Sequence, residues 1–191
     1  MIKIGILGNI GSGKSFVAKQ FACPVFDADK EVKRIYKNDR NCFKKFKKIL
    51  PKYISSFPVN KKEIATAILK EKKNLNKIIK IVHPLVRKRM NNFLYKNKNK
   101  KIVILDVPLP LENKLNNRNY ILIFVEAKQK DILKNLIKRK NYNPAIYKSL
   151  RNIQLPLEFK KKKSNYIIKN DFKSLTVKKS VKLIKKKILK I

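Results

Sequence analysis

The sequence has 191 residues, of which 43% are hydrophobic and 32% are charged. This length and composition predict one domain with a sizeable core and exclude a disordered chain. No stretch is apolar for the length that a membrane span needs, and the first residues read as a strand rather than a signal sequence, so we expect a soluble, cytoplasmic protein with no membrane partner. The cysteines, Cys23 and Cys42, are too few for a disulfide framework or a metal site, and we expect both to be reduced.

The net charge of +38, from 50 Lys and Arg against 12 Asp and Glu, raises the question of a polyanionic partner. The lysines occur almost everywhere along the chain rather than in one stripe. The chain is also rich in Ile, Asn, Tyr and Phe and poor in Gly, as expected where an A+T-rich genome has shifted exposed positions toward those codons. We therefore favour compositional drift and expect no specific nucleic-acid partner, although loose, salt-sensitive adhesion to RNA is compatible with this charge.

The predicted elements begin with a strand over residues 2–7, a loop over 8–15 and a helix over about 13–22. The loop, Gly-Asn-Ile-Gly-Ser-Gly-Lys-Ser, has the P-loop pattern in the strand-loop-helix context that this motif requires. Its glycines let backbone N–H groups surround phosphate oxygens, Lys14 is expected between the β- and γ-phosphates, and Ser15 on Mg²⁺. A turn that binds nothing is the alternative, disfavoured because all four glycines of the chain lie at positions 5, 8, 11 and 13.

An apolar run over residues 23–26 ends at two carboxylates, Asp27 and Asp29. Ligands of open parallel sheets lie beyond the carboxyl ends of the strands, so these side chains should arrive beside the P-loop. An acid or a base would be useful at that place. Asp29 could instead cap a helix that begins at Lys30.

Helical periodicity extends from about residue 30 to 98, with no convincing strand. Within it we predict helices over 61–72, 75–82 and 84–96. His83-Pro84 is interpreted as the entry to the last of these helices, because proline suits the first turn of a helix. A helical insertion of this length exceeds what a crossover between parallel strands needs.

Continuous runs of β-branched and other apolar residues over 102–108 and 120–125 predict strands that are buried on both faces. The remaining chain is predicted to form a helix, a second helix, a short strand and a terminal helix, over 128–140, 143–153, 166–168 and 173–190. The terminal helix should pack on the sheet through Leu175, Val181, Ile184 and Ile188. Its basic amphipathic pattern is also compatible with a membrane surface.

In their order and spacing these motifs resemble the dephospho-coenzyme A kinase family, P-loop kinases of coenzyme A synthesis, over nearly the whole chain. The P-loop alone specifies only an NTP-binding protein, whereas the segments that follow it are more selective. Those segments are Asp27-Ala28-Asp29, His83-Pro84-Leu85-Val86-Arg87, Asp106-Val107-Pro108-Leu109-Pro110-Leu111-Glu112, Arg139, Gln154-Leu155-Pro156-Leu157-Glu158 and Tyr166-Ile167-Ile168-Lys169-Asn170.

The resemblance implies a three-layer α/β P-loop kinase fold with a parallel five-stranded sheet. It implies transfer of the ATP γ-phosphoryl group, with Mg²⁺, to the ribose 3′-hydroxyl of dephospho-coenzyme A. We expect a monomer or weak homo-oligomer with a nucleotide-binding core, a helical coenzyme A-binding insertion and a lid, over residues 1–28 with 99–138 and 165–191, over 29–98, and over 139–164. The rivals are a nucleoside or nucleotide kinase with another acceptor and a basic nucleic-acid-binding NTPase.

The resemblance also implies catalytic roles. Asp29 is the candidate base that accepts the ribose proton or aligns that hydroxyl, while Asp27 organises the site through water and Mg²⁺; the sequence does not separate these two aspartates. Asp106 is expected near the Mg²⁺ water shell, with a solvent-facing acid as the alternative. Lys14 and Arg139 supply cations to the phosphates, Arg139 from the lid, where a solvated arginine is the alternative.

Further residues are implied to bind the two substrates. The nucleotide-binding set is Gly8, Asn9, Ile10, Gly11, Ser12, Gly13, Lys14, Ser15, Phe16 and Asn170, the last of them near adenine. The acceptor-binding set is Asp27, Asp29, His83, Arg87, Pro108 and Leu109. His83 could merely cap or pack, and Arg87, one turn later, could hold a substrate phosphate. Two positions depart from the family pattern: Asn9 replaces a glycine, a mild change for a residue that tolerates left-handed geometry, and Pro110 leaves the role of Glu112 open.

Overall fold

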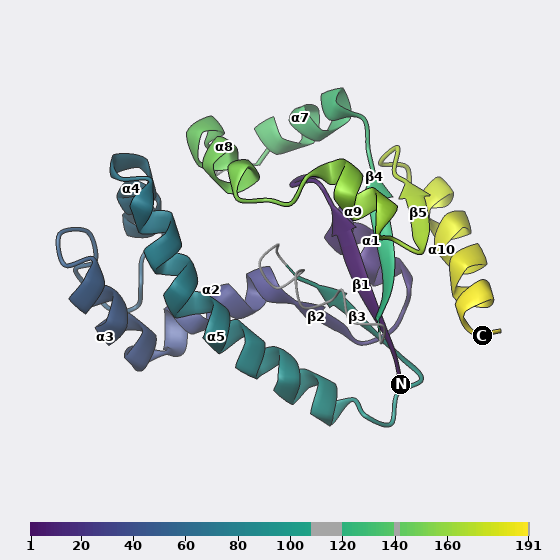
Figure 1. The fold of residues 1–191 in the computed structure, drawn as a ribbon, viewed down its shortest axis with the longest axis horizontal. Helices are drawn as coiled ribbons and strands as arrows, with labels where there is room; N and C mark the ends of the chain where they lie inside the picture. Colours follow the sequence, from purple (N-terminus) through teal and green to yellow (C-terminus); the bar gives the residue numbers. More distant parts are fainter. Residues whose placement is uncertain (108–119, 140–141, 191) are drawn as a thin grey trace.

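The computed structural model describes residues 1–107, 120–139 and 142–190. At its centre lies a sheet of five parallel strands in the order β2-β3-β1-β4-β5 (Figure 1). The strands are β1 (Ile2–Gly8), β2 (Val25–Asp27), β3 (Ile102–Asp106), β4 (Tyr120–Glu126) and β5 (Tyr166–Lys169). The predicted α/β fold with a parallel five-stranded sheet is confirmed.

The strand order places the P-loop at the middle of the sheet's carboxyl edge. β1 lies between β3 and β4, and the residues that follow β1 therefore have strand ends on both sides. In the register of β2 and β3, Asp27 is paired with Asp106, which brings two carboxylates side by side at this edge. Ligands of open α/β sheets bind at this edge, so the strand order alone predicts where the site lies.

The two faces of the sheet carry separate hydrophobic cores, because successive side chains of a strand point to opposite faces. On one face Ile4, Ile6 and Ile104 pack with the helices α1 (Lys14–Gln20) and α10 (Ser174–Ile188). On the other face, Leu7, Leu105, Leu122 and Phe124 pack with the helices between β2 and β3. A helix layer on each face of one sheet is the three-layer arrangement expected of this fold.

The helices between β2 and β3 extend away from the sheet (Figure 1). They are α2 (Ala28–Asn38), α3 (Arg40–Ile49), α4 (Lys61–Lys70) and α5 (Lys73–Lys96). Side-chain caps fix where two of them begin: Asp39 accepts a hydrogen bond from the backbone N–H of Cys42 at 2.8 Å, and Asn60 one from Lys62 at 2.9 Å. Glu31 of α2 forms salt bridges to Arg34 at 2.5 Å and to Arg89 of α5 at 3.0 Å, which ties α2 to α5.

Helix α5 is continuous where the sequence analysis predicted two helices. It runs from Lys73 to Lys96 with Pro84 in its interior, so the interpretation of His83-Pro84 as a helix entry is wrong. Proline there removes one backbone hydrogen bond, which costs about 3 kcal/mol. The buried residues Ile78, Val82, Val86 and Met90 follow one another at helical spacing across the proline. Burying such side chains contributes about 1.5–3 kcal/mol each, enough to offset the loss.

The chain after β4 forms α7 (Gln129–Ile137), α8 (Pro144–Asn152) and α9 (Leu157–Lys162). Asn143 caps α8, accepting a hydrogen bond from the backbone N–H of Ile146 at 3.0 Å. The predicted helix over 128–140 was too long, because α7 ends at Ile137. The sequence analysis predicted no element for α9, in which Lys160 is only 2% exposed.

The terminal helix α10 packs on the sheet as predicted, but through a slightly different face. Val177, Val181, Ile184 and Ile188 are buried, whereas Leu175 is 74% exposed, so its assignment to the inner face is wrong. Leu175 lies two positions before Val177, and two positions turn a side chain by about 200° around a helix of 3.6 residues per turn. Within the described ranges, no helix has the length and the apolar character needed to cross a membrane.

Candidate active site

The P-loop curls back on itself between β1 and α1. The backbone N–H of Ser12 donates to the carbonyl of Asn9 at 3.2 Å, and Lys14 Nζ donates to the same carbonyl at 2.9 Å. Gly8 has φ +146° and lies so close to β4 that a Cβ atom there would be 2.6 Å from the carbonyl oxygen of Val125. Only glycine fits this place, and the close approach of the loop to β4 therefore depends on Gly8.

Asn9 takes part in the loop in a way that the sequence analysis did not foresee. Its Oδ1 accepts a hydrogen bond from the backbone N–H of Ile10 at 2.8 Å, and the side chain is 5% exposed. Among the described residues other than glycine, only Ala22 and Phe172 have positive φ. The change to Asn9 therefore does not depend on the tolerance of left-handed geometry that the sequence analysis invoked: Asn9 lies outside that region, and its side-chain amide accepts a hydrogen bond within the loop.

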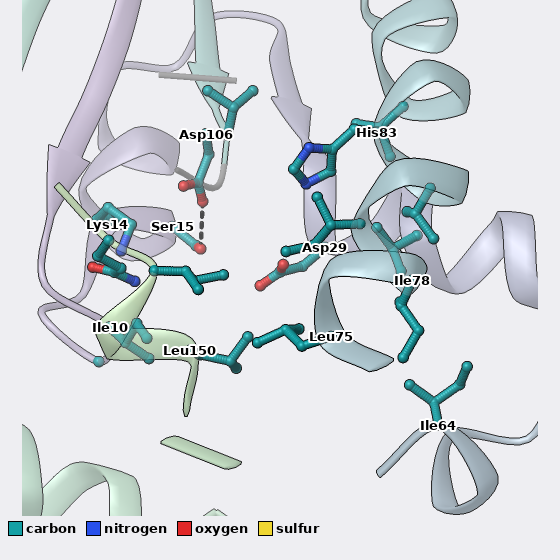
Figure 2. A pocket seen from close by; sticks show the side chains of 18 of the residues that line it. Ile10, Lys14, Ser15, Asp29, Ile64, Leu75, Ile78, His83, Asp106 and Leu150 are labelled. Atoms are coloured by element: carbon teal, nitrogen blue, oxygen red, sulfur yellow. Dashed lines mark hydrogen bonds between the residues drawn. The ribbon is translucent and has the colours of Figure 1, made fainter. Parts of the chain in front are cut away.

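Ser15 and Asp106 meet at the start of α1 and the end of β3. Ser15 Oγ donates to Asp106 Oδ2 at 2.5 Å (Figure 2). Burial raises the pKa of Asp106, the Ser15 hydrogen bond and the charge of Lys14 oppose this, and the charges of Asp29 and Asp27 raise it further. Asp106 is only 9% exposed, so the solvent-facing alternative is wrong. Four side chains from three elements therefore act on the Asp106 carboxylate: Ser15 and Lys14 of α1, Asp29 of α2 and Asp27 of β2.

The two aspartates near the end of β2, Asp27 and Asp29, have different positions in the structure. Asp27 caps α2, its Oδ1 accepting a hydrogen bond from the backbone N–H of Lys30 at 3.0 Å, and it lines a cavity of about 370 Å³ between α2 and α5. Asp29 is the second residue of α2, is exposed, and lines a second cavity together with most of the P-loop; Ser15 and Asp106 line both cavities. The alternative interpretation of Asp29 as a helix cap is wrong, and its carboxylate faces the site.

A cavity of about 480 Å³ joins the P-loop to the helices α2, α4, α5 and α8. Figure 2 shows Asp29 and His83 on one side and Lys14, Ser15 and Asp106 on the other, with their side chains directed into the same space. The opposite end of the cavity is apolar. Its wall includes Val32, Tyr36, Ile64, Ile68, Leu75, Ile78, Ile79, Val82, Val86, Leu150 and Ile153.

His83 lines this cavity from α5 and is half-buried. Burial lowers the pKa of His83, and the nearby charge of Arg87 lowers it further. The imidazole is therefore neutral at pH 7 and can accept a hydrogen bond as well as donate one. Arg87 itself does not line the cavity, and its buried Nε has no hydrogen-bond partner among the described residues. The structure brings His83, but not Arg87, to the cavity wall.

The segment after α7 brings further groups to the cavity. Arg139 follows α7 and is exposed, with its backbone N–H bonded to the carbonyl of Leu136 at 2.9 Å, and it lines the cavity together with Gln154. Ile10 lines it from the P-loop and Phe16 from α1. The sequence analysis gave Gln154 no role of its own. The predicted acceptor residues Pro108 and Leu109, and Glu112, lie outside the described residues.

Asn170 lies behind the P-loop rather than on the cavity wall. It follows β5, is 3% exposed, and its Nδ2 donates to the carbonyl oxygen of Ser12 at 2.8 Å. The contact joins the last strand to the phosphate loop across 158 residues of sequence. Sequence spacing did not indicate this contact, because no local pattern links residues so far apart.

The donors at the polar end suit Mg²⁺. Hydroxyl and carboxylate oxygens are its preferred ligands, and it is usually held by one or two carboxylates together with substrate phosphates. Ser15 Oγ and Asp106 supply such oxygens, and burial has left the Asp106 carboxylate short of compensating charge. Among the described residues no three His, Cys, Asp or Glu side chains are grouped to ligate a metal ion. The residues present fit Mg²⁺ held in part by a nucleotide.

Comparison with known proteins identifies the family. The family model described as dephospho-CoA kinase matches residues 2–175. The chain belongs to the dephospho-CoA kinase family. A dephospho-CoA kinase of Wolbachia from Brugia malayi is 32% identical over 170 residues, covering 86% of this chain and 87% of the relative. A dephospho-CoA kinase of Bacillus thuringiensis is 28% identical over 193 residues, covering 97% and 96%.

Solved structures support the fold of this family member. The protein TT1252 from Thermus thermophilus superposes with a TM-score of 0.78 at 25% identity, covering 100% of this chain and 97% of that one. Dephospho-CoA kinase from Campylobacter jejuni gives a TM-score of 0.64 at 19% identity, covering 97% and 96%. Shikimate kinase from Bacteroides thetaiotaomicron gives 0.55 at 14% identity, covering 100% and 99%. The P-loop kinase fold that the sequence predicted is confirmed.

Proposed function

We propose that this chain transfers the γ-phosphoryl group of ATP to the ribose 3′-hydroxyl of dephospho-CoA, which gives CoA and ADP. Membership of the dephospho-CoA kinase family supports the acceptor. The observation that carries the mechanism is the placement of Asp29 in the same cavity as Lys14 and Ser15, with its carboxylate not used as a helix cap.

In this reaction the bond between the 3′-oxygen and the γ-phosphorus forms while the bond from that phosphorus to the β,γ-bridging oxygen breaks, and ADP leaves. The 3′-hydroxyl proton passes to Asp29, which also aligns the oxygen for in-line attack. Lys14 Nζ donates a hydrogen bond to the Asn9 carbonyl of the P-loop. Its charge is the one that offsets the negative charge of the phosphates. Positioning and charge stabilisation supply most of the rate enhancement in phosphoryl transfer.

Ser15, directly, and Asp106, through water, are the residues that would hold Mg²⁺. The ion supplies positive charge to the phosphate oxygens when it is bound. The 2.5 Å contact between Ser15 Oγ and Asp106 Oδ2 supports this assignment, because the two oxygens lie close together.

The acceptor is assigned to the side of the cavity formed by α2 and α5. Neutral His83 would hydrogen-bond the acceptor beside Asp29, while Arg139 and Gln154 would reach the phosphates and the acceptor from the chain after α7. Asp27 supports this site indirectly by fixing the start of α2, and therefore the position of Asp29 two residues later. Arg87 acts on His83 through its charge, and Pro108 and Leu109 remain acceptor residues by family resemblance.

Steady-state kinetics of Asp29→Asn test the proposal. We expect kcat with dephospho-CoA to fall ~10²-fold or more, the usual contribution of one proton-transfer group. The KM for ATP should change little, because the P-loop is untouched. Asp131→Asn is the matched control: Asp131 lies in the first turn of α7, as Asp29 lies in that of α2, but it does not line the cavity.

The choice of acceptor is tested with an assay that measures ADP release. Dephospho-CoA should be phosphorylated, and the product should carry the new phosphate on the 3′-oxygen by ³¹P NMR. Turnover of a nucleoside but not of dephospho-CoA would overturn the acceptor, and a near-normal rate in Asp29→Asn would remove Asp29 as the base.

A further inference from the structure

Asn170 occupies a fixed position between the last strand and the P-loop. Its backbone N–H donates to the carbonyl of Glu126 at 2.7 Å, which continues the β4–β5 ladder by one step. Its Oδ1 accepts a hydrogen bond from the backbone N–H of Phe172 at 2.9 Å, and its Nδ2 donates to the carbonyl of Ser12 at 2.8 Å. The side chain is therefore held at both ends of its amide.

The turn that follows Asn170 is itself rigid. Phe172 has φ +62°, one of two positive values among the described residues other than glycine. Asp171 accepts hydrogen bonds from the backbone N–H of Lys173 and the hydroxyl of Thr176, both at 3.0 Å, and so fixes the start of α10. These contacts leave the Asn170 amide little freedom to turn away from the P-loop.

The contact with Ser12 decides the orientation of one peptide group in the phosphate cradle. In a trans peptide the C=O and the following N–H point in opposite directions. Asn170 holds the Ser12 carbonyl behind the loop, where Asn170 is only 3% exposed and does not line the cavity. The N–H of Gly13 must then point to the other side, and Gly13 does line the cavity. Backbone N–H groups of this loop are the ones that bind phosphate oxygens.

Gly13 and Asn170 are also matched in shape. Gly13 has φ +87°, and a Cβ atom there would lie 2.2 Å from Asn170 Nδ2. The amide thus fills the space that only glycine leaves beside the loop. Gly13 is also the N-cap residue of α1, so the contact fixes the start of that helix against the residue that follows β5.

We propose that Asn170 is a positioning residue for nucleotide binding: by holding the Ser12 carbonyl, it keeps the Gly13 N–H directed at the phosphates of the nucleotide. The inference rests on the proposed function only in taking the P-loop as a phosphate site, and it does not depend on the acceptor. It replaces the expectation that Asn170 contacts adenine. If Asn170 contacted adenine, its loss would not weaken the binding of a phosphate ligand that has no base. If Asn170 positions the P-loop, its loss weakens the binding of that ligand as well.

Two variants remove the hydrogen bond in different ways. Asn170→Ala deletes the amide, and Asn170→Asp keeps its shape but places an oxygen where the donor was, facing the Ser12 carbonyl. Asn165→Ala is the matched control: Asn165 Oδ1 accepts a hydrogen bond from the backbone N–H of Leu122 at 2.8 Å, so it also joins the β5 segment to another part of the chain, but at the other end of β5 from the P-loop.

The experiment measures the Kd of the full-length chain for ADP by calorimetry, and for inorganic tripolyphosphate by displacement of a fluorescent ADP analogue. Both are done at high salt, which screens the surface lysines. We expect both Asn170 variants to weaken ADP and tripolyphosphate by about tenfold, the loss typical of one buried hydrogen bond whose partner is left unpaired. Asn165→Ala should leave both Kd values unchanged. In the kinase assay, the KM for ATP should rise while the KM for dephospho-CoA stays the same.

Three outcomes would overturn the inference. They are an unchanged ADP Kd in both Asn170 variants, a loss for ADP without a loss for tripolyphosphate, which would restore the adenine contact, and an equal loss in Asn165→Ala, which would indicate general destabilisation. Thermal unfolding of the ligand-free variants accompanies the titrations. If Asn170→Ala does not fold, Asn170→Asp, whose volume is unchanged, carries the test alone. Failure of the acceptor assignment would leave these binding results untouched.

Discussion

At the residue scale, the placement of Asp106 lowers the stability of the fold and at the same time suits the function of the site. Asp106 is nearly buried, has two other carboxylates close by, and keeps a pKa above its ordinary value because burial disfavours its charge. Only the Ser15 hydroxyl and the charge of Lys14 act in the other direction. A buried charge with so little compensation is costly in the absence of a cation, and the same shortage of positive charge is what draws a cation to the site.

His83 is expected to make stability depend on pH in a defined window. Its pKa is lowered in the folded chain from the ordinary value of 6.5 by burial and by Arg87. Below pH 6.5 the unfolded chain therefore binds more protons than the folded chain, so the free energy of unfolding falls as the pH drops below this value and is unaffected by His83 above it. The slope is limited to about 1.4 kcal/mol per pH unit for one proton.

Urea unfolding of the wild type and of His83→Gln between about pH 5 and pH 8 checks this prediction. His83 is the only histidine of the chain, so the difference between the two curves isolates it from the carboxylates, Asp106 among them. We expect the curves to run parallel above about pH 6.5 and to diverge below it, with the wild type losing more stability. Parallel curves over the whole range would contradict the lowered pKa.

At the scale of elements, the sequence predicted what local patterns determine. The apolar runs of β1, β3 and β4 predicted the strands of the sheet, and the glycine spacing of the P-loop predicted the phosphate site. Two elements were misjudged, and each for a tertiary reason: α5 continues through Pro84 because its buried face is continuous, and α9 forms around a buried lysine. Local propensity does not contain these contacts.

The site shows the same division. P-loop residues and the carboxylates at strand ends could be placed from the sequence, because strand ends of a parallel sheet meet at one edge. The separation of Asp27 from Asp29 could not, since it depends on which residue caps α2. The hold of Asn170 on Ser12 could not either, because it joins residues at opposite ends of the chain.

Helix α5 gives a prediction at this scale. Pro84→Ala restores a backbone N–H in the interior of the helix and removes the clash of the proline ring with the preceding turn. We expect the free energy of unfolding to rise by about 1–3 kcal/mol, measured by urea unfolding at pH 7. Pro144→Ala is the control, because Pro144 is the first residue of α8 and its missing N–H is one that a helix does not use. An equal or larger gain in Pro144→Ala would contradict the assignment of the cost to Pro84.

At the scale of the whole molecule the net charge of +38 dominates. Within the described part of the chain, ion pairs join Glu31 to Arg34 and Arg89, Glu71 to Lys73, and Glu126 to Lys161. With 50 basic residues and 12 acidic ones, most lysines can have no acidic partner. The folded chain therefore repels itself more strongly than the expanded unfolded chain does, and this repulsion lowers its stability.

Added salt should stabilise this protein for that reason. Raising NaCl from about 0.01 M to 0.3 M shortens the screening length from about 30 Å to well under 10 Å, so charges on different elements cease to repel one another. We expect the urea midpoint of unfolding to rise steadily over this range. A midpoint that falls with salt would contradict the self-repulsion.

Retention of RNA by the chain should fall steeply over the same range of NaCl concentration, as it does when binding depends on counterion release alone. RNA binding that persists at about 0.3 M NaCl with a defined site size would show that the charge is selected for a polyanion after all.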